Sequence, residues 1–361
     1  MTDISITNKP TINQVVAMVA PGTVLREGIE RILKAHMGAL IVIGDSKEVL
    51  EICTGGFVID SPLTAQRLSE LAKMDGAIIL SKSTRRISRA NVQLVPNPDI
   101  PTSETGTRHR TAERVARSLE IPVIAVSEDL GTVTLYCGSD IRVLEPVSTL
   151  WNRANQLLQT LERFKTRFDL SLASLSALEV SDLVTVKDVS SVIQRAEMVK
   201  RVAKRAEEDI FQLGKDGTLL SMQLIELTEG IDKEELLVIR DYAASSDRHS
   251  ALVKVKELEK LSTKALLDLK EVASVVLSRG HEDIDLDDNL SARGNRLLSH
   301  IPRLPFAIVE SIVNYFGTLQ RIMRATEDDL GEVAGVGEAR ARNVKQGLSK
   351  LTEASIIDRY T

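Results

Sequence analysis

Apolar and polar residues alternate differently in three parts of the chain. In residues 1–150, short apolar runs of strand length alternate with segments whose apolar residues recur at helical spacing. In residues 151–290 only the helical spacing is found, and glycine is sparse. Residues 291–361 also show helical spacing, interrupted by short turns. The pattern predicts an α/β domain with a mixed sheet, an all-α spacer domain and a small all-α domain of helix–turn–helix periodicity.

Individual elements follow from the same periodicities. Helical spacing places apolar side chains on one face of residues 12–20, 24–35, 62–74, 111–119, 192–211, 236–242 and 251–279. Strand-length apolar runs cover residues 39–43, 77–80, 87–95, 123–126, 133–136 and 141–144. Residues 49–53 are expected to pair with residues 39–43 as the second strand of a hairpin.

Composition narrows the class of protein. Aromatic residues make up only 3% of the chain, so Leu, Ile, Val and Ala must fill the cores. The thiols of Cys53 and Cys137 lie in expected strands and are interpreted as buried filler, because two isolated cysteines make neither a disulfide framework nor a metal cluster. No apolar run approaches the roughly 20 residues of a membrane-spanning helix, and residues 1–20 lack a signal pattern. We expect a soluble cytoplasmic protein without membrane contact.

The net charge of −5 is unevenly distributed. Counting Lys and Arg against Asp and Glu gives −1 for residues 1–150, −6 for residues 151–290 and +2 for residues 291–361. Much of the acidic excess lies in the run His281–Asp288, which is interpreted as a solvated boundary loop. As a metal site, this run lacks the glycine and the closing glutamate of a calcium-binding loop.

The segment Thr105–Arg114 combines hydroxyls, a glycine, a histidine and three arginines where a loop meets a helix. Thr105 or Thr107 is expected to cap the helix, because a threonine hydroxyl can satisfy an orphan helix N–H group. Gly106 lets the backbone approach a ligand closely. Free N–H groups and the positive end of the helix dipole favour an anion there.

The side chains of this segment suit a phosphate group. Arg108 and Arg110 add forked donors that match phosphate geometry, and Thr107 and Thr111 share one helix face. His109 lies between the two arginines, whose charges are expected to lower its pKa and keep the ring neutral for contact with a phosphate or a metal. The alternative interpretation is a solvated basic cluster with a structural histidine.

About 30 residues upstream, Asp75 and Gly76 precede the apolar strand at 77–80. An Asp-Gly pair alone is typical of a turn. Beside a phosphate site, a carboxylate can instead bind a divalent metal or activate a hydroxyl for attack on phosphorus. Gly55 and Gly56 form either a hairpin turn or another loop that a ligand approaches closely.

These residues carry a resemblance. Asp75-Gly76-Ala77 followed by Gly106-Thr107-Arg108-His109-Arg110 resembles the paired Asp-Gly-Ala and Arg-His-Arg motifs of the diadenylate cyclases. The order of the surrounding motifs also matches, with Gly-Gly-Phe at 55–57, Pro-Thr-Ser-Glu-Thr-Gly-Thr at 101–107 and Ser-Glu at 127–128. Over essentially the whole chain the sequence is similar to the DNA integrity scanning family of these enzymes. That family has a cyclase domain, a helical spacer and a helix-hairpin-helix domain, which corresponds here to residues 1–150, 151–290 and 291–361.

The resemblance implies a reaction in which two ATP molecules give cyclic di-AMP and two pyrophosphates. It implies that Asp75 assists the 3′-hydroxyl and holds Mg²⁺ or Mn²⁺, and that the Arg108-His109-Arg110 motif takes part in catalysis. The nucleotide-binding residues that it implies are Gly76, Ala77, Leu94, Thr107, Arg108, His109, Thr111 and Ser127.

Oligomerisation follows from the product. Cyclic di-AMP contains two equivalent phosphodiester bonds, whereas each chain has one copy of the motif set, so two chains must face each other, most simply across a two-fold axis. The resemblance implies an octamer of four such dimers. It also implies branched or damaged DNA as a partner, location at the nucleoid, and recombination or repair proteins as candidate partners.

A second site is predicted in residues 330–344, where a helix, a glycine hairpin and another helix follow one another, and Gly335 and Gly337 are expected to keep the hairpin turn tight. Free N–H groups at the start of the second helix are expected to meet a DNA phosphate. The candidate DNA-binding residues are Gly335, Val336, Gly337, Arg340 and Lys345. Residues 300–305 occupy the place of a first hairpin but lack its glycines, and a simple corner between two helices is the alternative interpretation. Binding through the backbone would be independent of sequence and weak for a single copy.

Two other functions fit parts of the sequence. A non-catalytic, nucleotide-gated DNA-binding protein would have both sites without the chemistry. A structure-specific nuclease would use Asp75 to hold a metal, but no second carboxylate accompanies that residue. Formation of cyclic di-AMP from ATP distinguishes the three functions.

Overall fold

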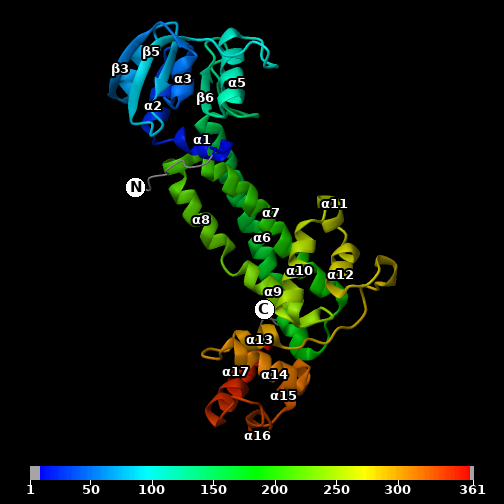
Figure 1. The fold of residues 1–361 in the computed structure, drawn as a ribbon. Coiled ribbons are helices and arrows are strands. Elements are labelled where there is room, and N and C mark those ends of the chain that lie inside the picture. Colours follow the sequence, from blue (N-terminus) through cyan, green and yellow to red (C-terminus); the bar gives the residue numbers. More distant parts are fainter. Residues whose placement is uncertain (1–8, 358–361) are drawn as a thin grey trace. The chain divides into compact units, whose positions relative to one another are not determined.

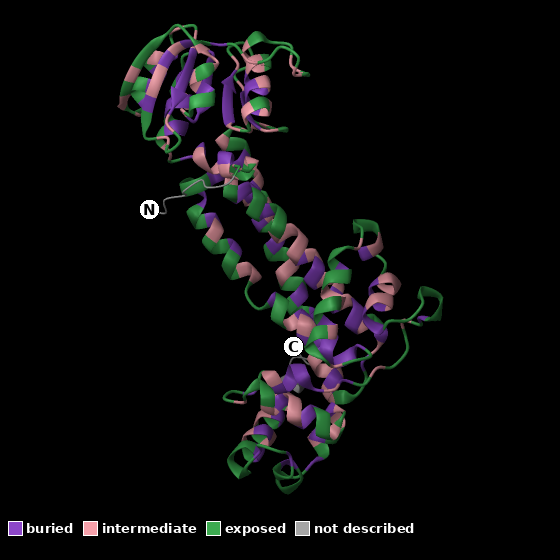
Figure 2. Ribbon diagram, in the orientation of Figure 1, coloured by how far each residue is buried: buried purple, intermediate pink, exposed green. Residues whose placement is uncertain are grey.

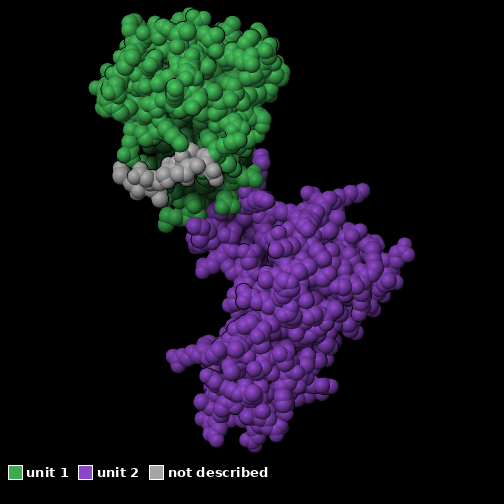
Figure 3. Space-filling model, viewed as in Figure 1, with its two compact units in different colours: residues 1–155, 207–222 green, residues 156–206, 223–361 purple. Residues whose placement is uncertain are grey.

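The structure is a computed structural model that describes residues 9–357. It divides into two compact units, unit 1 with residues 1–155 and 207–222, and unit 2 with residues 156–206 and 223–361 (Figures 1 and 3). The divisions fall inside the helices α6 (Val147–Ser181), α7 (Val186–Leu213) and α8 (Thr218–Thr228). The three domains expected from the sequence stay a prediction.

Within the described residues, unit 1 is built on an eight-stranded sheet of order β2-β5-β4-β1-β6-β7-β8, in which β3 also pairs with β5. The strands are β1 (Ala39–Ile43), β2 (Cys53–Thr54), β3 (Phe57–Pro62), β4 (Ala77–Leu80), β5 (Arg86–Leu94), β6 (Pro122–Val126), β7 (Val133–Cys137) and β8 (Asp140–Leu144). β1 and β4 pair in parallel, and the neighbouring pairs are antiparallel. The predicted mixed sheet is confirmed.

Helices cover both faces of this sheet, namely α1 (Ile12–Met18), α2 (Val24–Lys34), α3 (Lys47–Glu51), α4 (Ala65–Leu71) and α5 (Thr107–Leu119). Ile41 and Ile43 of β1 join a core with α1, α2 and α4, whereas Leu40 and Val42 join a second core with α5. Successive strand residues point to opposite faces. Because each face of the sheet carries a core, β1 is buried along its whole length (Figure 2).

The hairpin partner predicted at residues 49–53 is wrong. Lys47–Glu51 forms α3 instead, and only Cys53 and Thr54 continue as a strand, which pairs with β5. Val49 is fully buried on the sheet side of this short helix. The apolar residues in this segment can be buried by one turn of helix with Val49 facing the sheet, as well as by a strand.

The helix predicted from residue 62 begins later. Pro62 ends β3, and α4 begins at Ala65. The Thr64 hydroxyl accepts a hydrogen bond from the Arg67 N–H group at 3.2 Å and so caps the helix. β3 pairs on one side with β5, and a proline is tolerated at the end of such an edge strand.

The cysteines are both free thiols. Cys137 is buried in β7, and Cys53 is half-buried in β2. Burial raises the pKa of both thiols. The interpretation as filler therefore holds fully for Cys137 and in part for Cys53.

The rest of the described chain is helical, with a 3-10 turn η1 (Gly214–Gly217), then α9 (Ile231–Tyr242), α10 (Arg248–Glu259), α11 (Thr263–Leu266), α12 (Leu269–Leu277) and η2 (His281–Asp283). The single helix predicted at 251–279 is broken into α10, α11 and α12. The breaks are at Ser262 and Asp268, whose side-chain oxygens accept from the N–H groups of Ala265 and Lys270 and start new helices. No helix within residues 9–357 is long and apolar enough to cross a bilayer.

The C-terminal part of unit 2 contains α13 (Asn295–Ser299), α14 (Phe306–Phe316), α15 (Leu319–Arg324), α16 (Glu327–Gly331) and α17 (Glu338–Ile357). A buried polar network joins it to α6 and α9. The Asp241 carboxylate accepts the N–H groups of Gly294, Asn295 and Arg296 at 2.9, 2.7 and 3.0 Å and so caps α13. The Arg296 guanidinium donates to the buried carboxylate of Glu179 on α6.

Candidate functional site

A cavity of about 340 Å³ lies where β1 and β4 begin, β5 ends and α5 begins. Most of the predicted nucleotide-binding residues line it, namely Gly76, Ala77, Leu94, Thr107, Arg108 and Thr111, together with the predicted catalytic residue Asp75. These residues come from three separate segments of the chain, and the sheet brings them together. The site roles assigned to them stay predictions, but their convergence on one cavity is what a nucleotide site requires.

The start of α5 forms one wall of the cavity. The expectation that Thr105 or Thr107 caps this helix is wrong, because Gly106 is the N-cap and Thr107 is the first helical residue. Among the described residues no side chain accepts the first N–H groups of α5, and no acidic residue lies in its first turn. An added Cβ on Gly106 would make only an ordinary contact, 3.8 Å from Nδ1 of His109. The fold therefore does not require glycine there, and its small size leaves the helix start open to an anion.

Arg108 and Asp75 face each other across the cavity. Nη2 of Arg108 lies 3.8 Å from Oδ1 of Asp75, whose side chain is fully exposed. Thr111 lies one turn further along α5 and donates its hydroxyl to the Thr107 carbonyl at 2.9 Å. The carboxylate, the guanidinium and the helix start thus surround one space with opposite charges.

Gly38 is a functional candidate that sequence reasoning missed. An added Cβ at this position would lie 2.0 Å from Nη1 and 2.5 Å from Cζ of Arg108. The Arg108 guanidinium therefore rests against the bare backbone of Gly38, just before β1. A glycine before a buried strand was the only signal in the sequence, and it did not indicate which distant side chain would cover it.

Replacing Gly38 by alanine is expected to lower the rate of nucleotide turnover by about 10²-fold, because even a 1 Å displacement of a catalytic group can cost that much. The new methyl group would push the Arg108 guanidinium out of place, and a flexible side chain can move without unfolding the sheet. Turnover and thermal unfolding should be measured on Gly38→Ala, Arg108→Ala and the double variant. If Gly38 acts through Arg108, the double variant is no slower than Arg108→Ala alone. Additive losses would contradict this role.

Glycine at position 76 is needed for packing. An added Cβ there would lie 2.5 and 2.6 Å from the backbone carbon and Cα of Asn91 on β5. Asn91 has φ +53 and sits where the β4–β5 register shifts. The hairpin turn considered for Gly55 and Gly56 is wrong, because β2 and β3 both pair with β5. The two glycines instead interrupt this edge strand, and a Cβ on Gly56 would lie 2.7 Å from the Ala90 carbonyl oxygen. The alternative, a loop that a ligand approaches closely, stays a prediction.

His109 lies beside the cavity but does not line it. Its ring packs edge-on against Tyr136, with ring centroids 6.4 Å apart. Burial is the main cause that lowers the pKa of His109; Glu104 opposes it, and Arg108 adds to it. The predicted direction is confirmed, but the expected cause, the flanking arginines, contributes less than burial.

The loop before α5 is held by two carboxylates, Glu104 and Glu113, that sequence reasoning missed. The Tyr136 hydroxyl donates to Oε1 of Glu104 at 2.7 Å, and burial together with that carboxylate raises the pKa of Tyr136. The Glu113 carboxylate on α5 is 1% exposed and accepts from the hydroxyl of Thr102 and the N–H group of Ser103. These contacts set the position of the loop that leads into Gly106.

Besides His109, two further predicted residues lie outside this cavity. Arg110 is exposed on α5. Ser127 follows β6 in a turn, where its N–H group donates to the Thr132 carbonyl and its hydroxyl accepts from the Leu130 N–H group. Neither lines the cavity.

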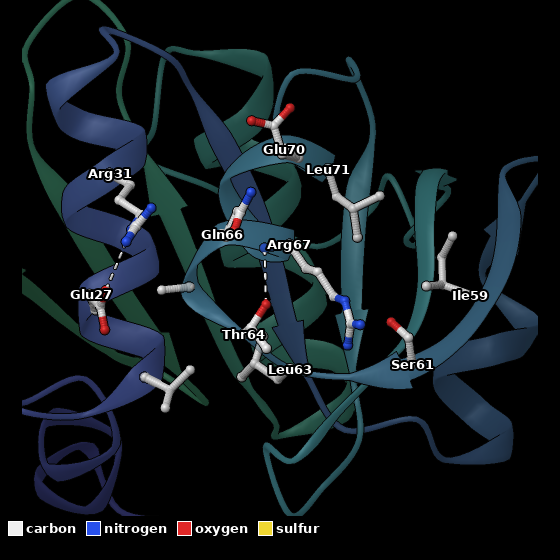
Figure 4. Close-up of a pocket in the computed structure, with 12 residues that line it drawn as sticks. Glu27, Arg31, Ile59, Ser61, Leu63, Thr64, Gln66, Arg67, Glu70 and Leu71 are labelled. Atoms are coloured by element: carbon white, nitrogen blue, oxygen red, sulfur yellow. Dashed lines mark hydrogen bonds and ion pairs between the residues drawn. The ribbon is translucent and has the colours of Figure 1, made fainter.

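A larger hollow of about 850 Å³ lies between α2, α4 and β3 (Figure 4). None of the predicted site residues lines it. Its charged side chains include Arg31, which pairs with Glu27 at 3.1 Å, and Arg67, which donates to the Pro62 carbonyl. These cations are already partnered within the hollow, so its size alone does not indicate a site for phosphates.

The predicted C-terminal hairpin joins α16 to α17. Gly335 has φ +85 and Val336 is buried, so this part of the turn depends on both. Gly337 is different, since no atom lies within 4 Å of an added Cβ. The expectation that Gly337 keeps the turn tight is therefore wrong, and its missing side chain instead leaves an open approach to the start of α17.

The two cations of this hairpin have structural partners. Nη1 of Arg340 donates to the Gly335 carbonyl at 2.6 Å and braces the turn. Nζ of Lys345 donates to the carbonyls of Met323 and Ala325 at 2.9 and 2.7 Å at the end of α15. The ammonium group of Lys345 thus caps the C-terminal end of α15. The exposed Arg340, in contrast, has other N–H donors that a ligand can accept.

Comparison with known proteins decides the family. The family model described as DisA bacterial checkpoint controller nucleotide-binding matches residues 26–141, and the DisA bacterial checkpoint controller linker region matches residues 144–283. A DNA integrity scanning protein DisA from Frankia alni is 52% identical over 345 residues, which cover 95% of this chain and 96% of that protein. A protein of the same name from Streptomyces coelicolor is 51% identical over 345 residues, 95% of this chain and 92% of that protein.

The chain belongs to the DisA family.

Membership confirms the resemblance drawn from the paired motifs, and with it the assignment of the chain as a diadenylate cyclase. The cavity beside α5 lies wholly within the residues that match the nucleotide-binding model. The long helices α6 and α7 lie within the match to the linker region. The DisA family therefore accounts for the order of a mixed α/β domain followed by helices.

Proposed function

We propose that this DisA family member joins two ATP molecules into cyclic di-AMP at the cavity beside α5, and that branched or damaged DNA bound by its C-terminal hairpins changes the rate. The observation that carries the proposal is the convergence of Asp75, Arg108 and the start of α5 on one cavity. A carboxylate, a guanidinium and free backbone N–H groups supply what attack on phosphorus requires: a base, charge neutralisation and positioning.

Each phosphodiester bond forms by one displacement. The 3′-hydroxyl oxygen of one ATP bonds to the α-phosphorus of the other, and the bond from that phosphorus to pyrophosphate breaks. Asp75 accepts the hydroxyl proton. Arg108 and the N–H groups at the start of α5 neutralise the charge that develops on the phosphate, while Leu94 packs against the adenine. His109 and Arg110 assist from the outer side of the helix start, and Ser127 contacts the phosphates once ATP is bound.

The Asp75 carboxylate fits a hard divalent cation, Mg²⁺ or Mn²⁺. It is fully exposed at the cavity, and its nearest cation is the Arg108 guanidinium at 3.8 Å, so its oxygens are open to a ligand. Mg²⁺ in phosphate sites typically uses one or two carboxylates together with substrate phosphates. Residues 9–353 place no group of three or more His, Cys, Asp or Glu around a common point, so phosphate oxygens would complete the coordination. The ion would supply charge neutralisation for the pyrophosphate that leaves.

The active unit is proposed to be a symmetric dimer. One chain brings one cavity with one Asp75, whereas cyclic di-AMP needs two equivalent displacements. Two cavities that face each other across a two-fold axis present each 3′-hydroxyl to the opposite α-phosphorus. An octamer of four such dimers would also present several C-terminal hairpins together, so that weak single contacts with DNA add up.

The DNA part of the proposal is supported by Gly337. The fold has no need of glycine at this position, yet a side chain there would stand in front of the start of α17. Close approach of a backbone phosphate is a reason for glycine at such a place. A DNA-bound cyclase acts in the cytoplasm at the nucleoid, where recombination or repair proteins are its candidate partners.

A four-way junction is expected to change the rate of cyclic di-AMP formation by about fivefold or more, a usual size for coupling between two sites. The purified chain should be incubated with ATP and Mg²⁺ or Mn²⁺, with and without saturating junction, and the product measured by mass spectrometry. Gly337→Val should lose most of the response, whereas the exposed Lys350→Ala should keep it. No cyclic di-AMP with either metal would contradict the cyclase site. An unchanged rate at saturating junction would contradict modulation by DNA.

A further inference from the structure

The C-terminal part of unit 2 contains the same helix–hairpin–helix unit twice. The first unit is α13, a turn and α14, and the second is α16, a turn and α17. Residues 32 positions apart in the two units are buried alike, as in the pairs Leu298 and Leu330, Ile301 and Val333, Val309 and Ala341, and Ile312 and Val344. The first hairpin, residues 300–305, is therefore built on the same plan as the glycine hairpin at 332–337.

Arg303 takes the place of Gly335 in this repeat. Its φ is +63, close to the +85 of Gly335, so the turn has the same left-handed residue at the same position. A non-glycine residue in this conformation costs about 1 kcal/mol or more. Glycine would adopt this turn at a lower conformational energy than arginine. The geometry of the turn therefore does not explain why an arginine occupies the position.

The first hairpin also lacks the backbone donor of the second. Pro305 stands at the position of Gly337 and has no N–H group. The first turn of α14 has no acidic residue, whereas α17 begins with Glu338. A phosphate at the first hairpin would thus lose one amide contact but meet no carboxylate from the first turn of its own helix.

The Arg303 side chain is available to a ligand. It is exposed, and no side chain in residues 9–353 forms an ion pair or a hydrogen bond with it. Its turn is held in place, because Nδ2 of Asn343 on α17 donates to the Pro302 carbonyl at 2.9 Å, and Gly347 of α17 lies against Ile301. A guanidinium on an anchored turn loses less freedom when it binds than one on a flexible loop.

We propose that Arg303 binds a phosphate of the DNA backbone, so that the first hairpin contacts DNA through a side chain where the second uses backbone amides. This inference rests on the DNA binding proposed above. Asn343, which fixes the first hairpin, lies six residues beyond Gly337, or about 9 Å along α17. A duplex carries a phosphate roughly every 3.4 Å along each strand, so one DNA arm can meet both hairpins.

The substitution Arg303→Gly distinguishes a role of Arg303 in the turn from a role in contact with DNA. In the full chain, glycine should relieve the backbone strain and raise the unfolding temperature, while affinity for a short DNA duplex falls roughly tenfold, as for a lost charged hydrogen bond. The slope of log affinity against log salt should fall by about 0.9 for each lost phosphate contact. Arg303→Lys should keep most of the affinity and the slope. Lys350→Ala, which removes the same charge from an exposed position on α17, should leave both unchanged.

Comparison with Gly337→Val distinguishes two negative outcomes: that Arg303 does not bind DNA, and that the C-terminal hairpins do not bind DNA at all. If Gly337→Val weakens binding but Arg303→Gly leaves affinity and salt slope at the wild-type values, the proposal for Arg303 is overturned and the DNA site stands. If neither variant weakens binding, both the DNA site and the role of Arg303 are rejected. A lower unfolding temperature for Arg303→Gly would also overturn the proposal, because the arginine would then serve the turn.

Discussion

Replacing Asp75 by asparagine is expected to slow the formation of cyclic di-AMP by roughly 10²–10⁴-fold, the usual contribution of a positioned general base. The amide has the shape of the carboxylate but cannot accept the proton of the 3′-hydroxyl and is a poorer ligand for a divalent cation. The fold should not suffer, because the Asp75 side chain is fully exposed and its one ion pair is a long 3.8 Å. ATP binding should persist, since Arg108 and the start of α5 are unchanged.

Turnover should be followed by mass spectrometry with ATP and either Mg²⁺ or Mn²⁺, and ATP binding by calorimetry. Asp140→Asn is the matched control, because Asp140 is an exposed aspartate at the start of β8 that does not line the cavity. A rate for Asp75→Asn within about tenfold of wild type, a barrier change of about 1.4 kcal/mol, would remove Asp75 from the chemistry.

Replacing Arg296 by methionine is expected to destabilise unit 2 by about 3–5 kcal/mol, the usual cost of removing one partner of a buried ion pair. Methionine fills a similar volume but leaves the Glu179 carboxylate buried without its cation, while the Tyr242 hydroxyl still donates to it at 2.8 Å. Unfolding in urea, followed by circular dichroism at a helix wavelength, measures the loss. Arg342→Met is the matched control, because Arg342 is exposed and its pair with Glu327 is a long 3.8 Å.

The pH dependence of this variant identifies the buried charge as the cause. Burial raises the pKa of Glu179, while Arg296 opposes that rise. Without Arg296 the pKa in the folded state rises further above that of the unfolded chain, so the folded variant binds the proton more readily. The stability deficit should therefore shrink as the pH falls and be largest at neutral pH. Adding Glu179→Gln should recover part of the loss, and a deficit below 1 kcal/mol at neutral pH would refute the argument.

Much of the sheet was predictable, because buried strands carry their own signal. The run at Ala39–Ile43 is apolar at every position, as β1 requires with a core on each face. Residues 49–53 show where that signal fails. The pattern of apolar and polar residues in this five-residue segment is compatible with one helical turn as well as with a strand. Packing of Val49 against the second core favours the helix α3.

The candidate site was predictable in its chemistry and less so in its geometry. Asp75, Arg108 and Thr107 were identified from residue type and order, and the sheet brings them to one cavity. The helix cap was assigned to a threonine because threonines are good caps, yet Gly106 takes the position and leaves the helix start open. Lys345 was assigned to DNA on its charge, whereas its ammonium closes the end of α15.

By itself, the sequence determined the α/β-then-helical order, the buried strands, the residues able to handle phosphate and, through its paired motifs, the family. These are properties of residue type, local periodicity and spacing, which short segments carry alone. Only the tertiary structure decided that Gly38 makes room for Arg108, that Gly337 is open where Gly335 is required, and that Arg303 repeats the position of Gly335. Each depends on atoms from segments far apart in the chain, and the distances between those atoms exist only after the chain has folded.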